Sequence, residues 1–130
     1  MKILLFTDLH MCPRASIISK WGTKYSARLE NCIATVNWLE RLAEEKNCDY
    51  IMNLGDFFDR PDLTSDTITA CNDIEWSNIM HYSIVGNHDA STSSLLFNSV
   101  NSFLSENHKI ITEPEVLELN DCYICFLPYI

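Results

Sequence analysis

Short apolar runs alternate with amphipathic segments along this chain of 130 residues, and their order constrains the fold more than any other feature. Between residues 25 and 46, apolar residues recur at spacings of three and four, which predicts a helix with one buried face. The alternation predicts an α/β chain of βαβαβα order with a mostly parallel sheet and right-handed crossovers. The strands and helices are predicted at 2–7, 25–46, 50–54, 64–77, 79–85 and 91–104.

The length of the chain limits it to one domain. Its last part contains three short strand candidates, at 109–112, 116–119 and 122–127. Residues 9–23 have no clear periodicity and are interpreted as a long loop. A loop of this length is unusual in a compact domain, so we suspect that it has a function.

Composition indicates a soluble globular protein, because apolar residues make up 47% of the chain and charged residues 21%. The apolar start is too short for a signal peptide or a membrane span, so we expect a cytoplasmic protein without membrane attachment. The six cysteines are expected to be reduced thiols. Cys122 and Cys125 form an isolated CxxC inside a strand-like run, which favours strand residues over a metal or redox site.

The net charge of −9 argues against binding of nucleic acid through the whole surface. The basic residues are concentrated, however, because no acidic residue lies between Asp8 and Glu30. This interval is either a solvated surface or a local patch that steers phosphate, and the charges alone leave both interpretations open. Its basic residues are Arg14, Lys20, Lys24 and Arg28.

Polar clusters follow each of the three predicted parallel strands. Asp8 and His10 follow the first, GDFFDR at 55–60 the second, and GNHD at 86–89 the third. Ligands bind outside the carboxyl ends of the strands in sheets of this kind, so the three clusters should meet at one edge. Each cluster alone is weak evidence, since a short polar turn has the same composition. Three such clusters, one after each of three successive strands, predict a metal site.

The residue types suit a metal site with oxygen and nitrogen ligands. If the backbone stays extended through Asp8 and His10, both side chains point to the same side. A glycine before Asp56 permits a sharp turn, and its carboxylate has two oxygens for two cations. Asn87 offers a neutral oxygen, which leaves His88 for proton transfer or charge stabilisation. Such mixed ligands favour manganese, iron or zinc over calcium.

The motifs D-x-H, G-D-x-x-D and G-N-H-D resemble the first three motifs of the calcineurin-like metallophosphoesterases. The longer stretches "FTDLH", "WLERLAEEKNCDYIMNLGDFFDR" and "YSIVGNHDAS" are most similar to the SbcD-like nuclease subunit of double-strand-break repair complexes. The resemblance covers essentially the whole chain. It implies an α/β/β/α sandwich, of which this chain would form the first half.

The resemblance also implies roles for individual residues. Asp8 and His10 would bind a first divalent cation, Asp56 would bridge, and Asn87 would bind a second, with manganese foremost and iron or zinc as alternatives. His88 would protonate the leaving oxygen or stabilise the transition state, and Asp59 would orient it. Arg60 would contact phosphate or pair with a carboxylate. The implied partners are DNA, an SMC-like ATPase and a second copy of the chain.

Members of this family normally take further histidine ligands from a second half of the domain, and nothing after residue 89 supplies them. His108 is expected on the solvated surface, and His81 within the sheet with a hydrogen-bond partner. We therefore expect residues 1–130 to be a truncated amino-terminal portion of one domain. Two alternatives to a DNA phosphodiesterase stay open: a phosphomonoesterase or cyclic-nucleotide phosphodiesterase, and a noncatalytic fragment that needs a second chain.

Overall fold

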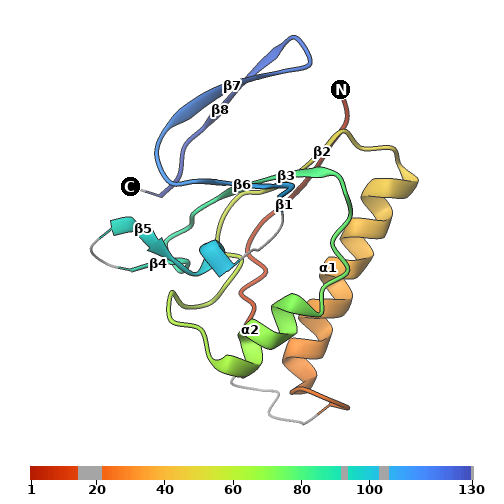
Figure 1. The fold of residues 1–130 in the computed structure, drawn as a ribbon, viewed down its shortest axis with the longest axis vertical. Coiled ribbons are helices and arrows are strands. Elements are labelled where there is room, and N and C mark those ends of the chain that lie inside the picture. Colours follow the sequence, from red (N-terminus) through yellow and green to blue (C-terminus); the bar gives the residue numbers. More distant parts are fainter. Residues whose placement is uncertain (15–21, 92–93, 103–105, 130) are drawn as a thin grey trace.

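The computed structural model describes residues 1–14, 22–91, 94–102 and 106–129 (Figure 1). Two helices and eight strands are found there, together with a short 3₁₀ helix. In chain order, the elements are β1 Ile3–Phe6, α1 Ala27–Glu45, β2 Tyr50–Asn53, α2 Ser65–Asn72, β3 Met80–Ile84, β4 Ala90–Ser91, β5 Ser94–Asn98, η1 Ser99–Ser102, β6 His108–Ile111, β7 Glu115–Leu119 and β8 Cys122–Phe126.

The main sheet has four parallel strands in the order β1-β2-β3-β6. All three predicted strands of the first part belong to it, and so does the first strand predicted in the tail. Because neighbouring strands run the same way, their carboxyl ends lie along one edge. The prediction of a parallel α/β sheet is therefore confirmed.

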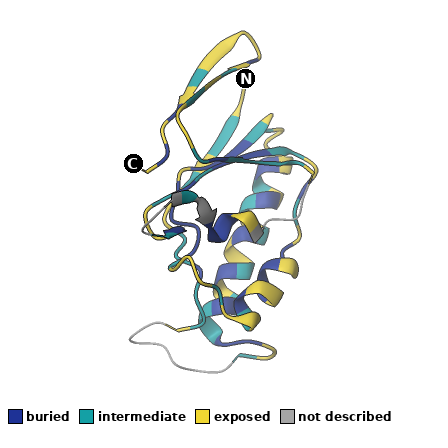
Figure 2. Ribbon diagram, turned by 60° about the vertical axis from the view of Figure 1, so that its left-hand side comes forward, coloured by how far each residue is buried: buried dark blue, intermediate teal, exposed yellow. Residues whose placement is uncertain are grey.

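The two faces of the sheet are covered differently (Figure 1). Helices α1 and α2 lie on one face, where Leu29 and Val36 are completely buried together with Phe57 and Phe58. The antiparallel hairpin β7-β8 packs on the other face through a second apolar cluster that includes Phe126. Figure 2 shows buried and exposed residues alternating along α1, as its amphipathic sequence predicts.

Both helical predictions after α1 need correction. Helix α2 ends at Asn72 rather than near 77. The helix predicted at 91–104 is wrong, because its described part forms β4, β5 and η1. Tertiary contacts account for this outcome: the amide and hydroxyl of Ser99 both donate to the carbonyl of Asp89, 2.9 and 3.2 Å away. Asn98 also bonds to neighbouring backbone groups, a competition that makes Ser and Asn poor helix formers.

A buried polar cluster joins α1 to the sheet. Glu40 of α1 accepts a hydrogen bond from Nε2 of His81 at 2.8 Å, and Ser77 donates both its amide and its hydroxyl to the same carboxylate. Burial acts to raise the pKa of Glu40, but these hydrogen bonds outweigh it and hold the pKa below its ordinary value. The expectation of a partnered sheet histidine at His81 is thus confirmed.

His108 extends this cluster, contrary to the expectation of a solvated side chain. Its ring stacks on His81 with centroids 4.1 Å apart, and it meets the Trp76 ring edge to face with centroids 4.8 Å apart. The local sequence around His108 is polar, so it gives no sign of burial. The pairing of β6 with β3 places the His108 ring next to His81 and Trp76.

All six cysteines are free thiols, and the strand predicted around Cys122 and Cys125 is confirmed as β8. Neither described helix is both long and apolar enough to cross a membrane.

Candidate metal centre

The loops after β1 and β2 continue side by side beyond the sheet. The amides of Asp8, His10 and Met11 donate in turn to the carbonyls of Gly55, Asp56 and Phe57, over 3.1, 3.0 and 2.8 Å. This ladder brings the first two polar clusters together. It confirms the expectation that the strand ends deliver their polar side chains to one edge.

The backbone of these loops is not extended. Asp8, His10 and Asp56 have φ angles of 55°, 48° and 53°, in the left-handed region that such residues adopt only with support from their surroundings. The extended conformation assumed for Asp8 and His10 is therefore wrong. The two side chains nevertheless meet, because Nε2 of His10 lies 3.4 Å from Oδ1 of Asp8.

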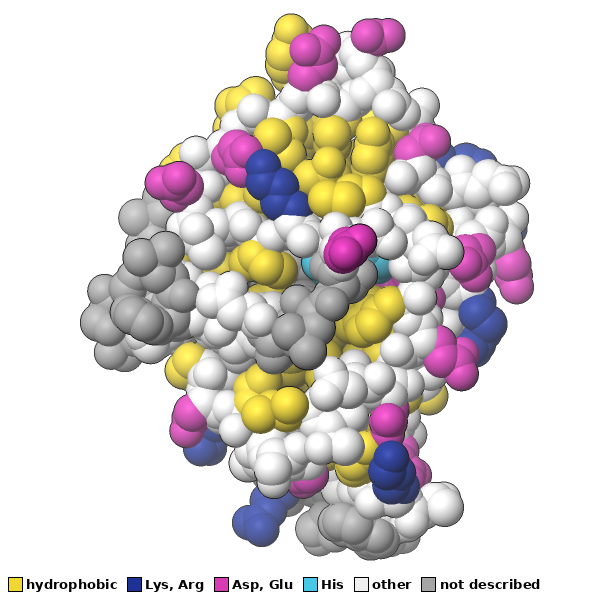
Figure 3. Space-filling model, in the orientation of Figure 1, with side chains coloured by type: hydrophobic (Ala, Val, Ile, Leu, Met, Phe, Trp, Pro, Cys, Tyr) yellow, Lys and Arg dark blue, Asp and Glu magenta, His cyan; other side chains and the backbone are white. Residues whose placement is uncertain are grey.

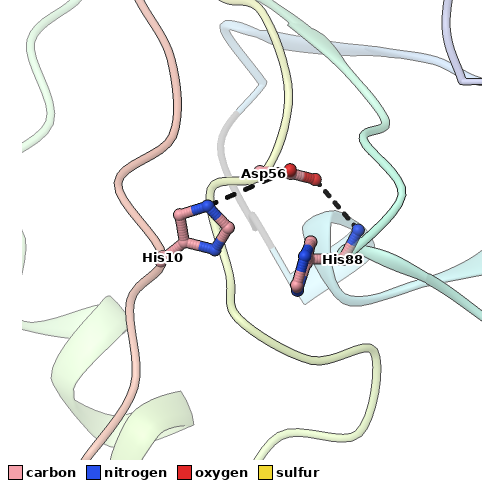
Figure 4. Close-up of side chains that lie close together, drawn as sticks. All are labelled: His10, Asp56 and His88. Atoms are coloured by element: carbon pink, nitrogen blue, oxygen red, sulfur yellow. Dashed lines mark hydrogen bonds and ion pairs between the residues drawn. The ribbon is translucent and has the colours of Figure 1, made fainter. Parts of the chain in front are cut away.

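His10, Asp56 and His88 come together at the centre of the site (Figure 4). They come from three different loops, and one candidate ligand atom from each lies within 4.8 Å of the others. Oδ1 of Asp56 accepts the amide of His88 at 2.9 Å, while Oδ2 lies 4.0 Å from Nε2 of His10. The two imidazole rings meet edge to face, with centroids 4.8 Å apart.

Asn87 lies on the other side of Asp56. A hollow of about 250 Å³ opens there, and its lining includes Asp8, Asp56 and Asn87. Asp8 and Asn87 are exposed, whereas Asp56 is only 9% exposed. Three of the four predicted metal ligands thus line one hollow, and His10 lies beside two of them, Asp8 and Asp56.

The predicted contact between Asp59 and His88 involves different atoms from those expected. The ring Nδ1 of His88 lies 3.0 Å from the main-chain carbonyl of Asp59, and 3.9 Å from its carboxylate. A carbonyl can only accept, so Nδ1 of His88 carries the proton and Nε2 is left for another partner. The Asp59 carboxylate lies closer to His10, with 3.3 Å between Oδ1 and Nδ1.

Two glycines permit this close approach. Gly55 has a φ of 112°, in the range that favours glycine. A methyl group placed on Gly86 would lie 2.2 Å from Oδ1 of Asp56 and 2.3 Å from its amide nitrogen. The second and third loops can therefore touch only because Gly86 has no side chain.

Asp89 is a site residue that the sequence reasoning did not single out. Its carboxylate is completely buried and accepts the amide of Phe58 at 2.8 Å and that of Gly86 at 3.0 Å. One side chain thus clamps the second loop to the third. Burial raises the pKa of the Asp89 carboxyl, and the two amides oppose that effect. The only signal in the sequence was its place directly after His88.

The predicted basic residues divide into three groups. Nη2 of Arg28 donates to the carbonyls of Leu9 and His10, both at 3.1 Å, so this guanidinium is committed to the first loop. Lys24 pairs with Asp73 at 2.9 Å, away from the cluster, and this hydrogen bond raises the pKa of Lys24. Arg14 and Arg60 are exposed near Asp59, and Lys20 lies outside the described residues.

The visible face in Figure 3 has scattered Lys and Arg side chains and no continuous basic patch. This agrees with the net charge of −9. Any contact with a polyanion on this face must therefore be local.

A sequence model of the family described as calcineurin-like phosphoesterase matches residues 1–126. The chain belongs to this family. Comparison with curated proteins finds no match. The crystal structure of Pseudomonas putida nuclease MPE is similar, with a TM-score of 0.55 and 27% identity over 89% of this chain. The match covers 50% of that nuclease chain, so this chain spans about half its length.

Calcineurin-like phosphoesterases of the metal-dependent type imply divalent cations, and the residues present fit such ions. Nε2 of His10 faces the carboxylates of Asp8 and Asp56, with 3.4 and 4.0 Å between the atoms. Nδ1 of His10 is buried and has no hydrogen bond among the described residues. A nitrogen and several carboxylate oxygens that face one another are suited to manganese, iron or zinc.

Proposed function

We propose that this protein is a metal-dependent phosphodiesterase that acts on DNA. The observation that carries the proposal is the convergence of His10, Asp56 and His88 from three loops, in a member of the calcineurin-like phosphoesterase family. The similarity to a nuclease of known structure favours a nucleic-acid substrate. Repair or recombination of DNA is the process in which the SbcD-like subunits that the sequence resembles take part.

In this proposal, Asp8 and His10 would hold one cation, Asp56 would serve both cations, and Asn87 would hold the second, with manganese as the metal. The contacts of His10 with Asp8 and Asp56, and the hollow that Asp8, Asp56 and Asn87 line together, support this assignment. When bound, divalent cations lower the pKa of a water molecule and neutralise charge on the phosphate. The protein supplies the positions of these ligands through the two aligned loops.

His88 is proposed as the catalytic acid. With Nδ1 held by the Asp59 carbonyl, a protonated His88 donates from Nε2 to the leaving oxygen and then returns to the neutral ring. Asp59 orients His88 through this carbonyl, while its carboxylate faces His10. Arg14 and Arg60 are proposed to contact phosphate, because both are exposed beside Asp59.

The test is manganese-dependent cleavage of DNA by the full-length form of the protein. Asp56→Ala and His88→Ala should each abolish cleavage, whereas the matched control Glu113→Ala, at an exposed acidic residue, should not. Undiminished cleavage by both site variants would contradict the proposal. A panel that adds phosphomonoesters and cyclic nucleotides separates the DNA phosphodiesterase from the alternative esterases.

A second proposal follows from the length of the match. Because the chain spans half of the nuclease chain, residues 1–130 are proposed to be the amino-terminal part of a larger phosphoesterase unit that another segment or chain completes. Leu5 and Leu54 are 57% and 44% exposed, which is high for apolar side chains. Under this proposal the isolated chain is a noncatalytic assembly piece. Tight binding of two manganese ions by the isolated chain in a calorimetric titration would argue against it.

The resemblance to SbcD-like subunits extends the proposal to partners, namely an SMC-like ATPase and a second copy of this chain. Size-exclusion chromatography with light scattering tests the homodimer. Co-purification with an SMC-like ATPase from the same cell tests the other partner, and free migration of both proteins would contradict it.

A further inference from the structure

A pocket of about 510 Å³ adjoins the metal centre, and its lining includes the two arginines proposed above to contact phosphate. It lies between the segment after β1, which supplies Met11 and Arg14, and the region after β2, which supplies Arg60 and Leu63. Asp59 lines this pocket and also faces His10 at 3.3 Å. A molecule in the pocket would therefore reach the metal centre directly.

The walls of the pocket are fixed by the fold. Met11 forms a parallel bridge with Phe58, its amide donates to the carbonyl of Phe57, and its carbonyl accepts the amide of Asp59 at 3.3 Å. Met11 and Thr67, which both line the pocket, are only 1% and 2% exposed. Such a preformed hollow is within the usual range for small-molecule sites, about 300–1,000 Å³.

The lining combines two free cations with an apolar wall. Arg14 and Arg60 are exposed and form no ion pair with any residue that the structure describes. Of the three carboxylates in the lining, Asp66 accepts hydrogen bonds at the start of α2, Asp59 faces His10, and Asp62 is exposed. The lining therefore has two positive and three negative side chains, a net charge of −1. Attraction of an anion to this pocket must come from the two guanidinium groups themselves.

We infer that this pocket binds one nucleotide of the substrate strand, next to the phosphate at the metal centre. The two guanidinium groups suit a phosphate, and the half-buried apolar side chain of Leu63 suits a base. The inference rests on the proposed function and refines it. The substrate class is then an oligonucleotide that extends beyond the bond to be cleaved, rather than an isolated phosphate ester.

Cys12 gives a readout that does not depend on activity. It lines the pocket and is partly exposed, while Cys122 and Cys125 are exposed on the β7-β8 hairpin and serve as internal controls. Iodoacetamide labelling of each cysteine is followed by mass spectrometry, with EDTA present so that the metal centre does not capture phosphate. Thymidine 5′-monophosphate should slow labelling of Cys12 severalfold and leave the other two unchanged.

Variants sharpen this experiment. Arg60→Ala should abolish the protection of Cys12, whereas Arg41→Ala should retain it, because Arg41 is an exposed arginine near Glu75 on the helical side. Equal protection by inorganic phosphate would overturn the inference, since it would show an anion site only. Absence of protection, or equal slowing at Cys122, would also overturn it.

A kinetic experiment separates this inference from the proposed function. Arg60→Ala should lower kcat/KM for a short oligonucleotide about tenfold or more, the cost of one charge-assisted hydrogen bond. Hydrolysis of bis(4-nitrophenyl) phosphate, which has no neighbouring nucleotide, should fall by a much smaller factor. An equal loss on both substrates would overturn the inference. If the isolated chain cleaves neither substrate, as expected for a piece that another segment completes, the labelling of Cys12 still decides whether the pocket binds a nucleotide.

Discussion

Acid should destabilise this protein through His108. Burial, reinforced by the neighbouring His81 and opposed by Glu40, lowers the pKa of His108 from 6.5 to about 3. The unfolded chain therefore binds a proton at this ring that the folded chain excludes between pH 6.5 and about 3. The stabilising contribution is fully present above pH 6.5 and is lost progressively as the pH falls towards 3.

The magnitude follows from the pH interval. Each pH unit below 6.5 costs about 1.4 kcal/mol in the free energy of unfolding, so a fall to pH 4.5 costs at most about 2.7 kcal/mol. His108 is only half-buried, and solvent screening reduces the expected loss to about 2 kcal/mol. Glu40 contributes in the same direction, since its lowered pKa makes stability fall when its carboxyl is protonated.

The assay is urea unfolding at several pH values between 7.5 and 4.5, with EDTA present so that metal binding does not contribute. His108→Phe is the matched variant, because it keeps an aromatic ring next to His81 and Trp76, and this ring cannot titrate. The free energy of unfolding of the unaltered protein should fall by about 2 kcal/mol more than that of the variant over this range. Parallel pH profiles for the two proteins would refute the reasoning. An NMR titration that places the pKa of His108 near 6.5 would refute it as well.

Three further predictions concern the residues that hold the metal loops in place. Gly86→Ala should weaken manganese binding more than about tenfold in calorimetry and destabilise the fold by about 1–3 kcal/mol, because the new methyl group displaces Asp56; unchanged affinity would contradict the proposed ligand. Asp89→Asn should lower the free energy of unfolding, measured in urea, by about 2 kcal/mol, since one of the two buried amides then faces the NH2 donor of asparagine. A loss below about 0.5 kcal/mol would show that Asp89 does not hold the second and third loops together. Arg28→Lys keeps the charge but loses the Nη2 group that donates to the carbonyls of both Leu9 and His10, so manganese affinity should fall while Arg41→Ala leaves it unchanged.

The parts of the fold that sequence predicts well are those encoded by local periodicity. The first three parallel strands and α1 are set by apolar spacing within a few residues, and they occur where expected. The helix predicted at 91–104 failed because its pattern is ambiguous and its Ser and Asn side chains bond to distant or neighbouring backbone. The prediction of a solvated His108 failed because its burial depends on Trp76, 32 positions earlier in the chain.

In the candidate site, too, one part can be predicted from sequence and another cannot. The ligand types can be recognised from sequence, because aspartate and histidine that recur directly after successive buried strands are typical of a metal site. Their geometry could not be recognised, since it depends on residues that bind no metal. Asp8, His10 and Asp56 adopt left-handed backbone conformations. Such conformations cost about 1–3 kcal/mol each and persist only where the surroundings enforce them.

The surroundings here are specific. Arg28 donates to the carbonyls of Leu9 and His10, and Asp89 holds the second loop against the third through two buried amides. Gly86 leaves the space that Asp56 fills. Because each of these contacts joins segments far apart in the chain, none has a local pattern. The strain in the three ligand residues is therefore balanced by long-range contacts, so variants at Arg28, Gly86 and Asp89 should weaken manganese binding without removing any ligand.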